Sequence, residues 1–497
     1  MSQLYEQQGL EGGVRAGMGC AASAGRMSEC RLLIDGEWIE GSGTLEVLDK
    51  YTQEPCGLIH LPSREQIAEA VHSAAQAFGR HEMSAFERGE ILDNAVDHLE
   101  LRRAELMEAL VREAGFVQQD AANEIKRCMQ TLRLSAVEAR ALTGEMVPLD
   151  GSSGQRNRVG FTIRVPLGVV CAITPFNAPL NTVAHKLAPA LAAGNAVVLK
   201  PSTHAPTPAR ILVEALLDAG LPPRMVQLIH GAAQEADWLL NEQDIAFYAF
   251  TGSTDVGRKI QQRVGLRRTQ MELGSIAFTI VCEDADLDQA LPRIVNASFR
   301  KAGQVCTSVQ RLLVHESIRE RVESRLVPLV ERLSYGDPSA PQTVVGPVIS
   351  IMAAERIESW IREAIDRGGR LLVGGARHGA VVSPTLLADV DPGCSVCCRE
   401  VFGPVLVLET FKSMDEAIAR VNGTPFGLAA GLFTNRLDDA FHAIRRLQVG
   451  GVHVNETSNS RVDSMPYGGT KNSGFGREGP RYAIREMSEE RMVSILV

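Results

Sequence analysis

The sequence predicts an α/β protein built around doubly wound parallel sheets, and three observations support this prediction. After Gly160, short apolar runs bounded by Gly and Pro alternate with helical stretches, which is the pattern of repeated β-α units. A second set of alternating elements runs from about 287 to 455. The 497 residues also exceed the roughly 300 at which one hydrophobic core stops growing. We therefore expect at least two α/β domains.

The expected strands are short and apolar, which is typical of a sheet buried on both faces. Those of the first set are 168-GVVCAITP, 195-NAVVLKP, 225-MVQLIHG, 246-AFYAFTG and 278-FTIVCED. Helices are expected between them, among others at 206–219 and 255–264. The second set has expected strands near 311-RLLVHE, 371-LLVGG, 404-PVLVLE and 428-LAAGLF.

Helical sequence precedes the first set of strands. Ser63 and Gln66 form a capping-box pattern ahead of apolar residues at helical spacing. Residues 84–142 have no Pro and are rich in Ala, Leu, Glu and Arg, which predicts a helical layer. Residues 1–27 have neither this periodicity nor the apolar core of a secretory signal, so we expect a disordered extension there.

Charge and hydropathy exclude two classes of partner. The formal net charge is −9 and no run of Lys and Arg stands out, so binding to nucleic acid is not expected. The longest apolar stretches, such as 167–173 and 187–193, are far shorter than the roughly 20 residues that span a bilayer. We expect no membrane insertion.

Ten cysteines in a chain of this length do not form the dense disulfide framework of a small secreted domain. A reducing, cytoplasmic location is therefore expected. Cys394, Cys397 and Cys398 are clustered, but no second Cys/His pair follows at the spacing of a zinc site. We expect no metal site.

Three residues carry side chains suited to acyl chemistry. Cys306, in 303-GQVCTS, could be a nucleophile if its pKa is lowered, although a lone cysteine is more often structural. Glu272, in 271-MELGS, lies among apolar neighbours that would raise its pKa and make it a base toward water. Asn177, in 174-TPFNAPL, follows an expected strand, where an amide N–H can donate to an oxyanion. Taken singly, Glu272 and Asn177 are equally compatible with ordinary turns.

Two further segments are suited to a nucleotide. The segment 200-KPST ends a buried strand with a Lys, which can hold ribose hydroxyls, and 250-FTGSTDVG is a strand-to-helix turn of small residues that can seat a pyrophosphate. The usual G-x-G-x-x-G pattern is absent from this turn. Alone, it would be weak evidence for a dinucleotide.

Together and in this order, these motifs closely resemble the aldehyde dehydrogenase superfamily, from about Leu32 to Val497. Asn177, Lys200, Glu272 and Cys306 each lie within the corresponding family motif, and 400-EVFGPV matches the family's E-x-F-G-P segment. The resemblance implies that Cys306 attacks an aldehyde and that Asn177 and the Cys306 backbone N–H hold the oxyanion. Hydride then passes to NAD or NADP, and Glu272 activates the water that hydrolyses the thioester.

The resemblance also implies the residues that surround the coenzyme. Lys200, Glu400 and Phe402 would position its riboses, Gly252 and Ser253 would face the pyrophosphate, and Gly257 would let the next helix approach. The full set of implied coenzyme-binding residues is Thr174, Pro175, Phe176, Lys200, Ser202, Thr203, Gly252, Ser253, Gly257, Leu273, Glu400 and Phe402.

The family fold implies three structural units. These are a Rossmann-like cofactor domain at 28–148 and 168–275, a catalytic α/β domain at 276–465, and a small β bridging element at 149–167 and 484–497. An exposed apolar strand pair needs a partner for its free edge. We therefore expect a homodimer or homotetramer.

Coenzyme and substrate are less closely specified. NAD-specific members often carry Glu three residues after the Lys, whereas this chain has Thr203 there, so NADP is also admissible. Residues 124–145 and 459–487 resemble the branch that includes lactaldehyde, non-phosphorylating glyceraldehyde-3-phosphate and phosphono- or sulfo-aldehyde dehydrogenases. Arg127 and Arg461 fall where the family lines its substrate tunnel, which favours a short polar or anionic aldehyde. The alternative is that both form structural ion pairs, for example with Glu124 or Asp463.

Two other functions remain open at this point. Cys306, Glu272 and Asn177 could catalyse acyl transfer alone, as a cofactor-free cysteine esterase or thioesterase, although the β-α cofactor motifs argue against it. A catalytically silent relative that keeps the fold for binding is the second alternative. Retention of all four motif residues argues against that alternative, and the change of the family's ELGG to 272-ELGS leaves it some room.

Overall fold

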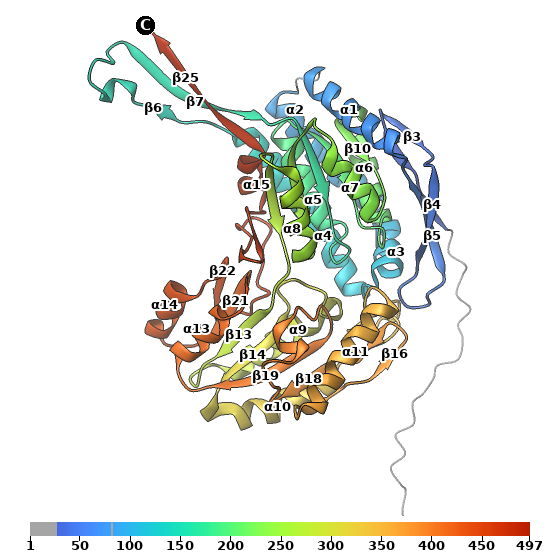
Figure 1. Ribbon diagram of the computed structural model, residues 1–497, viewed down its shortest axis with the longest axis vertical. Helices are drawn as coiled ribbons and strands as arrows, with labels where there is room; N and C mark the ends of the chain where they lie inside the picture. Colours follow the sequence, from blue (N-terminus) through green and yellow to red (C-terminus); the bar gives the residue numbers. More distant parts are fainter. Residues whose placement is uncertain (1–26, 81–82) are drawn as a thin grey trace, which may run out of the picture.

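The computed structural model describes residues 27–80 and 83–497, and it places them in two lobes with a projecting arm (Figure 1). The extension expected at 1–27 therefore lies, except for Met27, outside the described residues. Each lobe is built on one large, mainly parallel sheet. This arrangement confirms the α/β fold class predicted from the alternating elements.

The first sheet has eight strands in the order β24-β12-β11-β8-β9-β10-β2-β3. Its five central strands are parallel and most of their residues are buried. Four of the five apolar runs predicted for the first set form β8, β9, β10 and β11. The fifth run, 278-FTIVCED, lies instead in the second sheet as β13 (Ala277–Val281), and β12 takes the remaining central place. The strands of the first sheet are β2 (Leu32–Ile34), β3 (Glu37–Ile39), β8 (Val169–Ile173), β9 (Ala196–Lys200), β10 (Val226–Leu228), β11 (Ile245–Thr251), β12 (Arg268–Glu272) and β24 (Gly474–Phe475).

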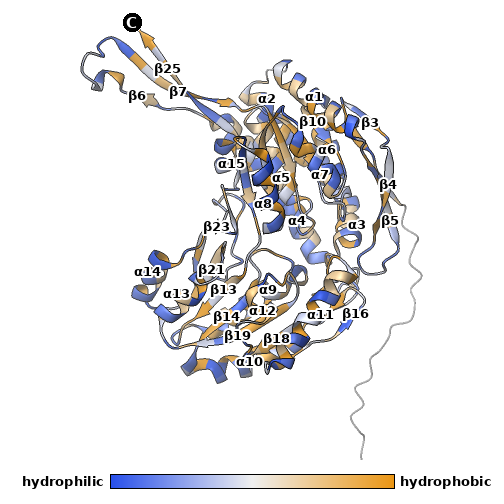
Figure 2. Cartoon of the chain, viewed as in Figure 1, coloured by the Kyte–Doolittle hydropathy of each residue, from blue (hydrophilic) through white to orange (hydrophobic). Residues whose placement is uncertain are grey.

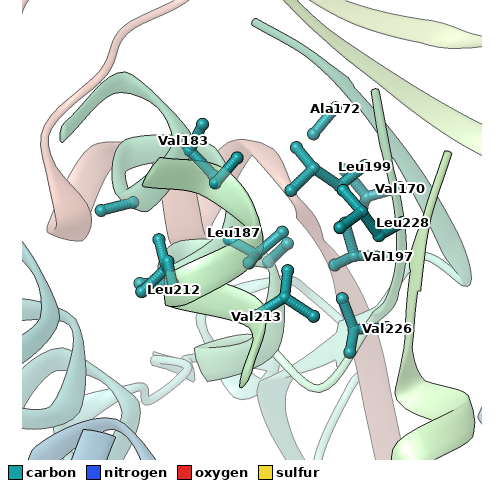
Figure 3. Close-up of a cluster of buried hydrophobic side chains, with 14 of the residues drawn as sticks. Val170, Ala172, Val183, Leu187, Val197, Leu199, Leu212, Val213, Val226 and Leu228 are labelled. Atoms are coloured by element: carbon teal, nitrogen blue, oxygen red, sulfur yellow. The ribbon is translucent and has the colours of Figure 1, made fainter. Parts of the chain in front are cut away.

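Helices cover both faces of this sheet. Figure 3 shows Leu187 of α5 and Val213 of α6 against the apolar side chains of the central strands. Burial of each such side chain contributes about 1.5–3 kcal/mol. The helices of this lobe are α1 (Arg64–Arg80), α2 (Ala85–Leu101), α3 (Arg103–Ala114), α4 (Gln118–Ala141), α5 (Asn181–Ala192), α6 (Thr207–Asp218), α7 (Ala233–Asn241) and α8 (Thr254–Val264).

The predicted helix starts are also confirmed. The Ser63 backbone N–H donates to Gln66 Oε1 (2.9 Å) and the Gln66 backbone N–H donates to Ser63 Oγ (3.2 Å), which is the reciprocal capping box at the start of α1. Residues 84–142 form the helical layer α2–α4. No helix in the described ranges is both long enough and apolar enough to cross a membrane.

The strand order of the first sheet creates a switch point. From β8 the chain moves outward through β9 and β10, then returns to the other side of β8 with β11 and β12. The loops that leave β8 and β11 therefore diverge at the carboxyl edge of the sheet. Ligands of open α/β sheets bind at such a point.

The second sheet has seven strands in the order β15-β18-β19-β14-β13-β21-β22, of which only the edge strand β15 is antiparallel. Figure 2 shows its strands mainly in the colours of hydrophobic residues. The elements of this lobe are β13 (Ala277–Val281), α9 (Leu287–Phe299), β14 (Val309–His315), α10 (Arg319–Glu331), α11 (Ile351–Asp366), β15 (Arg370–Val373), β18 (Thr385–Ala388), β19 (Val405–Phe411), α13 (Met414–Asn422), β21 (Ala429–Phe433), α14 (Leu437–Arg446) and β22 (Gly451–Val454).

Smaller elements complete the fold. The arm in Figure 1 is a three-stranded antiparallel sheet in which β25 (Ser488–Leu496) pairs with β7 (Arg158–Pro166) over its whole length and β6 (Met146–Val147) pairs with the other edge of β7. A second small sheet holds β1 (Ser28–Cys30), β4 (Gly43–Leu48) and β5 (Pro55–Leu61). Helix α15 (Pro480–Glu486) leads into the arm.

Candidate active site

A cavity of about 430 Å³ lies between the carboxyl edge of the first sheet and the amino edge of the second. This volume falls in the range of small-molecule sites. The loops at the switch point contribute to its wall, as the strand order predicts. The predicted site residues that line it are Arg127, Pro175, Phe176, Asn177, Gly252, Ser253, Glu272, Leu273, Cys306, Glu400, Phe402 and Arg461.

Cys306 lies in a tightly constrained segment that joins α9 to β14. Lys301 and Ala302 adopt positive φ angles of 50° and 51°, which non-glycine residues rarely hold unless the surroundings enforce them. Gly303 has φ +69°, and a Cβ there would lie 2.0 Å from the carbonyl oxygen of Gly403. The segment therefore packs directly against the loop that carries Glu400 and Phe402, and a larger residue at 303 would separate them.

Cys306 is half-buried, and its sulfur lies beside a phenol. Its Sγ lies 2.7 Å from the hydroxyl oxygen of Tyr467. Burial raises the pKa of the Cys306 thiol to about 11, while the Tyr467 hydrogen bond and the charge of Arg461 oppose that rise. The site thus contains groups that favour the thiolate within an environment that disfavours it.

Glu272 is the last residue of β12 and is 3% exposed. Neither carboxylate oxygen has a hydrogen-bond partner among the described residues. Burial, together with the nearby charge of Glu478, raises the pKa of Glu272 well above its usual range. A buried carboxylate without partners is costly, and one with a raised pKa is suited to accept a proton from water.

Asn177 lies in the loop that follows β8. Its backbone carbonyl accepts a hydrogen bond from Lys301 Nζ (3.0 Å), and the same ammonium group pairs with Glu124 (2.8 Å). This buried contact joins the Asn177 loop to the segment that carries Cys306. The side chain of Asn177 lines the cavity.

The predicted coenzyme residues occupy two places. Phe176 and Phe402 meet edge to face with ring centroids 5.7 Å apart, and Glu400 accepts a hydrogen bond from the Ser275 backbone N–H (2.9 Å). Burial raises the pKa of Glu400 to about 7. Gly257 packs under Leu273, because a Cβ there would lie 2.4 Å from a Leu273 methyl carbon.

Five predicted coenzyme residues do not line this cavity, namely Thr174, Lys200, Ser202, Thr203 and Gly257. Lys200 ends β9, next to β8, and its carbonyl accepts a hydrogen bond from the Thr174 backbone N–H (3.2 Å). Burial lowers the pKa of Lys200 to about 8. These five residues therefore lie outside the cavity that contains Cys306.

The two arginines predicted at the substrate tunnel line the cavity, and both are ion-paired. Arg127 donates to both oxygens of Asp463 (2.7 and 3.2 Å), and Arg461 donates to Glu478 (2.6 Å). Asp463 also pairs with the buried His185 (3.0 Å). The pair with Asp463 corresponds to the structural alternative considered for Arg127.

The family model for the aldehyde dehydrogenase family matches residues 38–493, which is almost the whole chain. The chain belongs to the aldehyde dehydrogenase family. The resemblance inferred from the sequence motifs is therefore confirmed, and so are the family's fold and its NAD(P)-dependent oxidation of aldehydes.

Relatives of this aldehyde dehydrogenase support the predicted branch. The chain is 45% identical to 3-sulfolactaldehyde dehydrogenase from Priestia aryabhattai, and the match covers 93% of this chain and 97% of that protein. Aldehyde dehydrogenase 21 from Physcomitrella patens, solved with the reaction product succinate, superposes with a TM-score of 0.92 at 36% identity, covering 95% and 99% of the two chains. The glyceraldehyde-3-phosphate dehydrogenase GapN from Methanocaldococcus jannaschii, solved with NADP, has a TM-score of 0.88 at 36% identity, covering 91% and 99%.

Sequence reasoning missed several residues of this aldehyde dehydrogenase that line or support the cavity. Tyr467 and Glu478 come from the segment after β22, and Arg300 follows directly after α9. Lys186 in α5 is fully buried and pairs with Glu478 (2.9 Å). The only sequence signal for that pair was a Lys inside an otherwise apolar helix, which implies a buried carboxylate partner.

Proposed function

We propose that this enzyme oxidises a short polar aldehyde, anionic or α-hydroxylated, to the carboxylic acid through a thiohemiacetal and a thioester on Cys306. The main observation in support is that the Cys306 thiol, the unpartnered Glu272 carboxylate and the Asn177 side chain share one cavity at the switch point. Either NAD or NADP serves as the coenzyme, and when bound it supplies the hydride acceptor.

In the first half-reaction the Cys306 thiolate adds to the aldehyde carbon, and the carbonyl oxygen becomes an oxyanion. We assign the stabilisation of this oxyanion to the Asn177 side-chain N–H and the Cys306 backbone N–H, because both residues line the cavity. The tetrahedral adduct then loses hydride, which leaves an acyl group bonded to Sγ. The anchored loops keep these donors in place, because Lys301 ties the Asn177 loop to the Cys306 segment.

In the second half-reaction Glu272 accepts a proton from water, and the resulting hydroxide attacks the thioester carbonyl. The acid leaves as the Cys306 thiolate is restored. Glu272 is suited to this step because no donor among the described residues binds its oxygens, and its raised pKa makes it a stronger base than an exposed carboxylate.

The residues at the switch point fit a dinucleotide. Gly252 and Ser253 line the cavity where α8 begins, so the first N–H groups of this helix are available to a pyrophosphate. The buried Oγ1 of Thr174 has no partner among the described residues. We assign the adenosine side of the coenzyme to Lys200, Ser202 and Thr203. We assign the nicotinamide side to Pro175, Phe176, Leu273, Glu400 and Phe402. Gly257 would support α8.

We propose an anionic head group for the substrate. Sulfolactaldehyde, succinate and glyceraldehyde-3-phosphate, named for the relatives above, carry a sulfonate, a carboxylate and a phosphate. Arg127 and Arg461 line the cavity as candidate anchors, but an anion would compete there with Asp463 and Glu478. Arg300 lines the same cavity and makes no ion pair among the described residues, where its buried Nε also lacks a partner. Of these three arginines, Arg300 is therefore the one that most needs an anion.

The test is reduction of NAD and NADP at 340 nm with acetaldehyde, benzaldehyde, lactaldehyde, succinic semialdehyde, phosphonoacetaldehyde and 3-sulfolactaldehyde. We expect the anionic aldehydes to have the highest kcat/KM, because a charge-assisted hydrogen bond contributes about 1.5–3 kcal/mol. Higher kcat/KM for neutral aldehydes would contradict the anionic substrate. Ester hydrolysis without any coenzyme reduction would favour a cysteine hydrolase, and binding of coenzyme without either reaction would favour a silent relative.

Replacing Arg300 with glutamine is expected to lower kcat/KM for the best anionic aldehyde by about 10- to 100-fold, and for a neutral aldehyde by much less. The same assay with both aldehydes measures this difference. Arg332→Gln, at an exposed arginine beyond α10, is the matched control and should leave both values unchanged. Equal losses for charged and neutral aldehydes would contradict the anchor.

We also propose that the arm pairs with further copies of the chain to give a homodimer or homotetramer. Leu496 and Met146 expose 74% and 72% of their surface, and the outer edge of β25 pairs with no described strand. Light scattering should therefore give a mass of at least twice 53.8 kDa.

We also propose a cytoplasmic location. All nine cysteines in the described residues are free, which is consistent with a reducing compartment.

We propose the domain limits implied by the family, with the cofactor domain at 28–148 and 168–275 and the catalytic domain at 276–465. The linker between the two large sheets, from Glu272 to Ala277, supports a boundary at 275. The strand β24 lies outside the sequence range of the cofactor domain but belongs to its sheet, because it pairs with β12.

A further inference from the structure

The backbone of Tyr467 is anchored by hydrogen bonds, and this anchoring helps to hold its side chain against Cys306. Tyr467 and Glu478 form an antiparallel bridge, in which the Tyr467 N–H donates to the Glu478 carbonyl (3.1 Å) and the Glu478 N–H donates to the Tyr467 carbonyl (2.7 Å). The side chain is 8% exposed. The phenol oxygen is therefore fixed 2.7 Å from the Cys306 sulfur rather than placed there by a mobile loop.

The direction of this hydrogen bond depends on which of the two groups is ionised. Burial raises the pKa of Tyr467 well above its usual range, and the adjacent Cys306 adds to the rise, so the phenol keeps its proton. When Cys306 is ionised, its sulfur has no proton to donate, so the phenol is then the donor and the sulfur is the acceptor. A thiolate accepts a hydrogen bond more strongly than a thiol does, so this contact favours the ionised, nucleophilic form of Cys306.

The guanidinium group of Arg461 lies over a face of the Tyr467 ring. The Arg461 guanidinium carbon is 3.7 Å from the centroid of the Tyr467 ring. Arg461 is held there by Glu478, which also binds Lys186 (2.9 Å). A cation over an aromatic face withdraws electron density from the ring, so it makes the phenol a stronger donor.

Other charges face Cys306 as well. Glu272 and Glu400 raise the pKa of the thiol, as burial does, and only Tyr467 and Arg461 are among the main groups that lower it. Among the described residues, the phenol is the one group that makes a hydrogen bond to the sulfur. Its removal should therefore leave the thiolate without its direct partner.

We propose that Tyr467 is a catalytic residue of this enzyme, whose hydroxyl stabilises the Cys306 thiolate and orients it for attack, and that Arg461 is a positioning residue that strengthens this donor. The proposal rests on the proposed role of Cys306 as the nucleophile. It also gives the Arg461–Glu478 ion pair a function that does not require contact with the substrate.

The test is the pH dependence of Cys306 alkylation by iodoacetamide, followed on the Cys306 peptide by mass spectrometry. It needs no aldehyde, so a wrong substrate assignment cannot affect it. Tyr467→Phe is expected to raise the apparent pKa of Cys306 by about one unit, which slows alkylation about tenfold below that pKa. Tyr335→Phe, at a 52% exposed tyrosine, is the control and should leave the profile unchanged.

Superimposed alkylation profiles for the parent enzyme and Tyr467→Phe, with unchanged Tm, would overturn the role of Tyr467. The role of Arg461 is tested with Arg461→Met, or with Arg461→Lys if the first variant does not fold. Either is expected to raise the apparent pKa in the parent, and to raise it less in the Tyr467→Phe background, where only the direct effect of the Arg461 charge on the thiol is changed. Equal shifts in the two backgrounds would show that Arg461 does not act through the phenol.

Discussion

Replacing Cys306 with alanine should abolish aldehyde oxidation, with a loss in kcat of at least about 10,000-fold. The adjacent Thr307 hydroxyl is not expected to take over as nucleophile, because it already donates to Asn459 (3.1 Å). The variant removes only the sulfur atom. We therefore expect the fold and coenzyme binding to be retained, and the 340 nm assay to show no turnover with either coenzyme.

Cys398→Ala is the matched control, because Cys398 is exposed and does not line the cavity. Its kcat should equal that of the parent enzyme. Coenzyme binding by Cys306→Ala, measured by titration of intrinsic fluorescence, separates a lost nucleophile from a lost fold. Turnover of Cys306→Ala within about tenfold of the parent would contradict the covalent mechanism.

The fold could be predicted largely from local patterns. The strands β8, β9, β10 and β11 are short, mainly apolar and followed closely by Gly or Pro, and such signals depend only on neighbouring residues. The order of those strands could not be obtained in this way. The pairing of β24 with β12, for example, joins residues about 200 positions apart and is set by tertiary packing.

In the candidate site, too, local motifs could be predicted from the sequence, whereas contacts between distant segments could not. Cys306, Glu272 and Asn177 stand in recognisable local motifs, and the structure brings all three to one cavity. Tyr467 has no local sign of its position against Cys306, because that contact depends on the bridge to Glu478. Likewise, nothing in the sequence distinguishes the unpaired Arg300 from the paired Arg127.

Replacing Glu272 with glutamine should separate the two half-reactions. Glutamine has nearly the same volume but cannot accept a proton from water, so hydrolysis of the thioester should slow by about 100- to 10,000-fold. Thiol addition and hydride transfer do not require this base. We expect a rapid burst of about one NAD(P)H per subunit followed by very slow turnover, and an acyl adduct on the Cys306 peptide by mass spectrometry.

The pH dependence adds an independent check on Glu272. Because burial raises the pKa of Glu272, the parent enzyme should hold more of the active carboxylate as pH rises, and the deacylation rate should increase through that pKa. Glu272→Gln should lose this dependence, while Glu69→Gln, at an exposed position on α1, should keep it. A variant that neither accumulates acyl-enzyme nor loses the pH dependence would mean that another group activates the water. In the described part of the cavity that group would be Glu400, whose pKa burial raises to about 7.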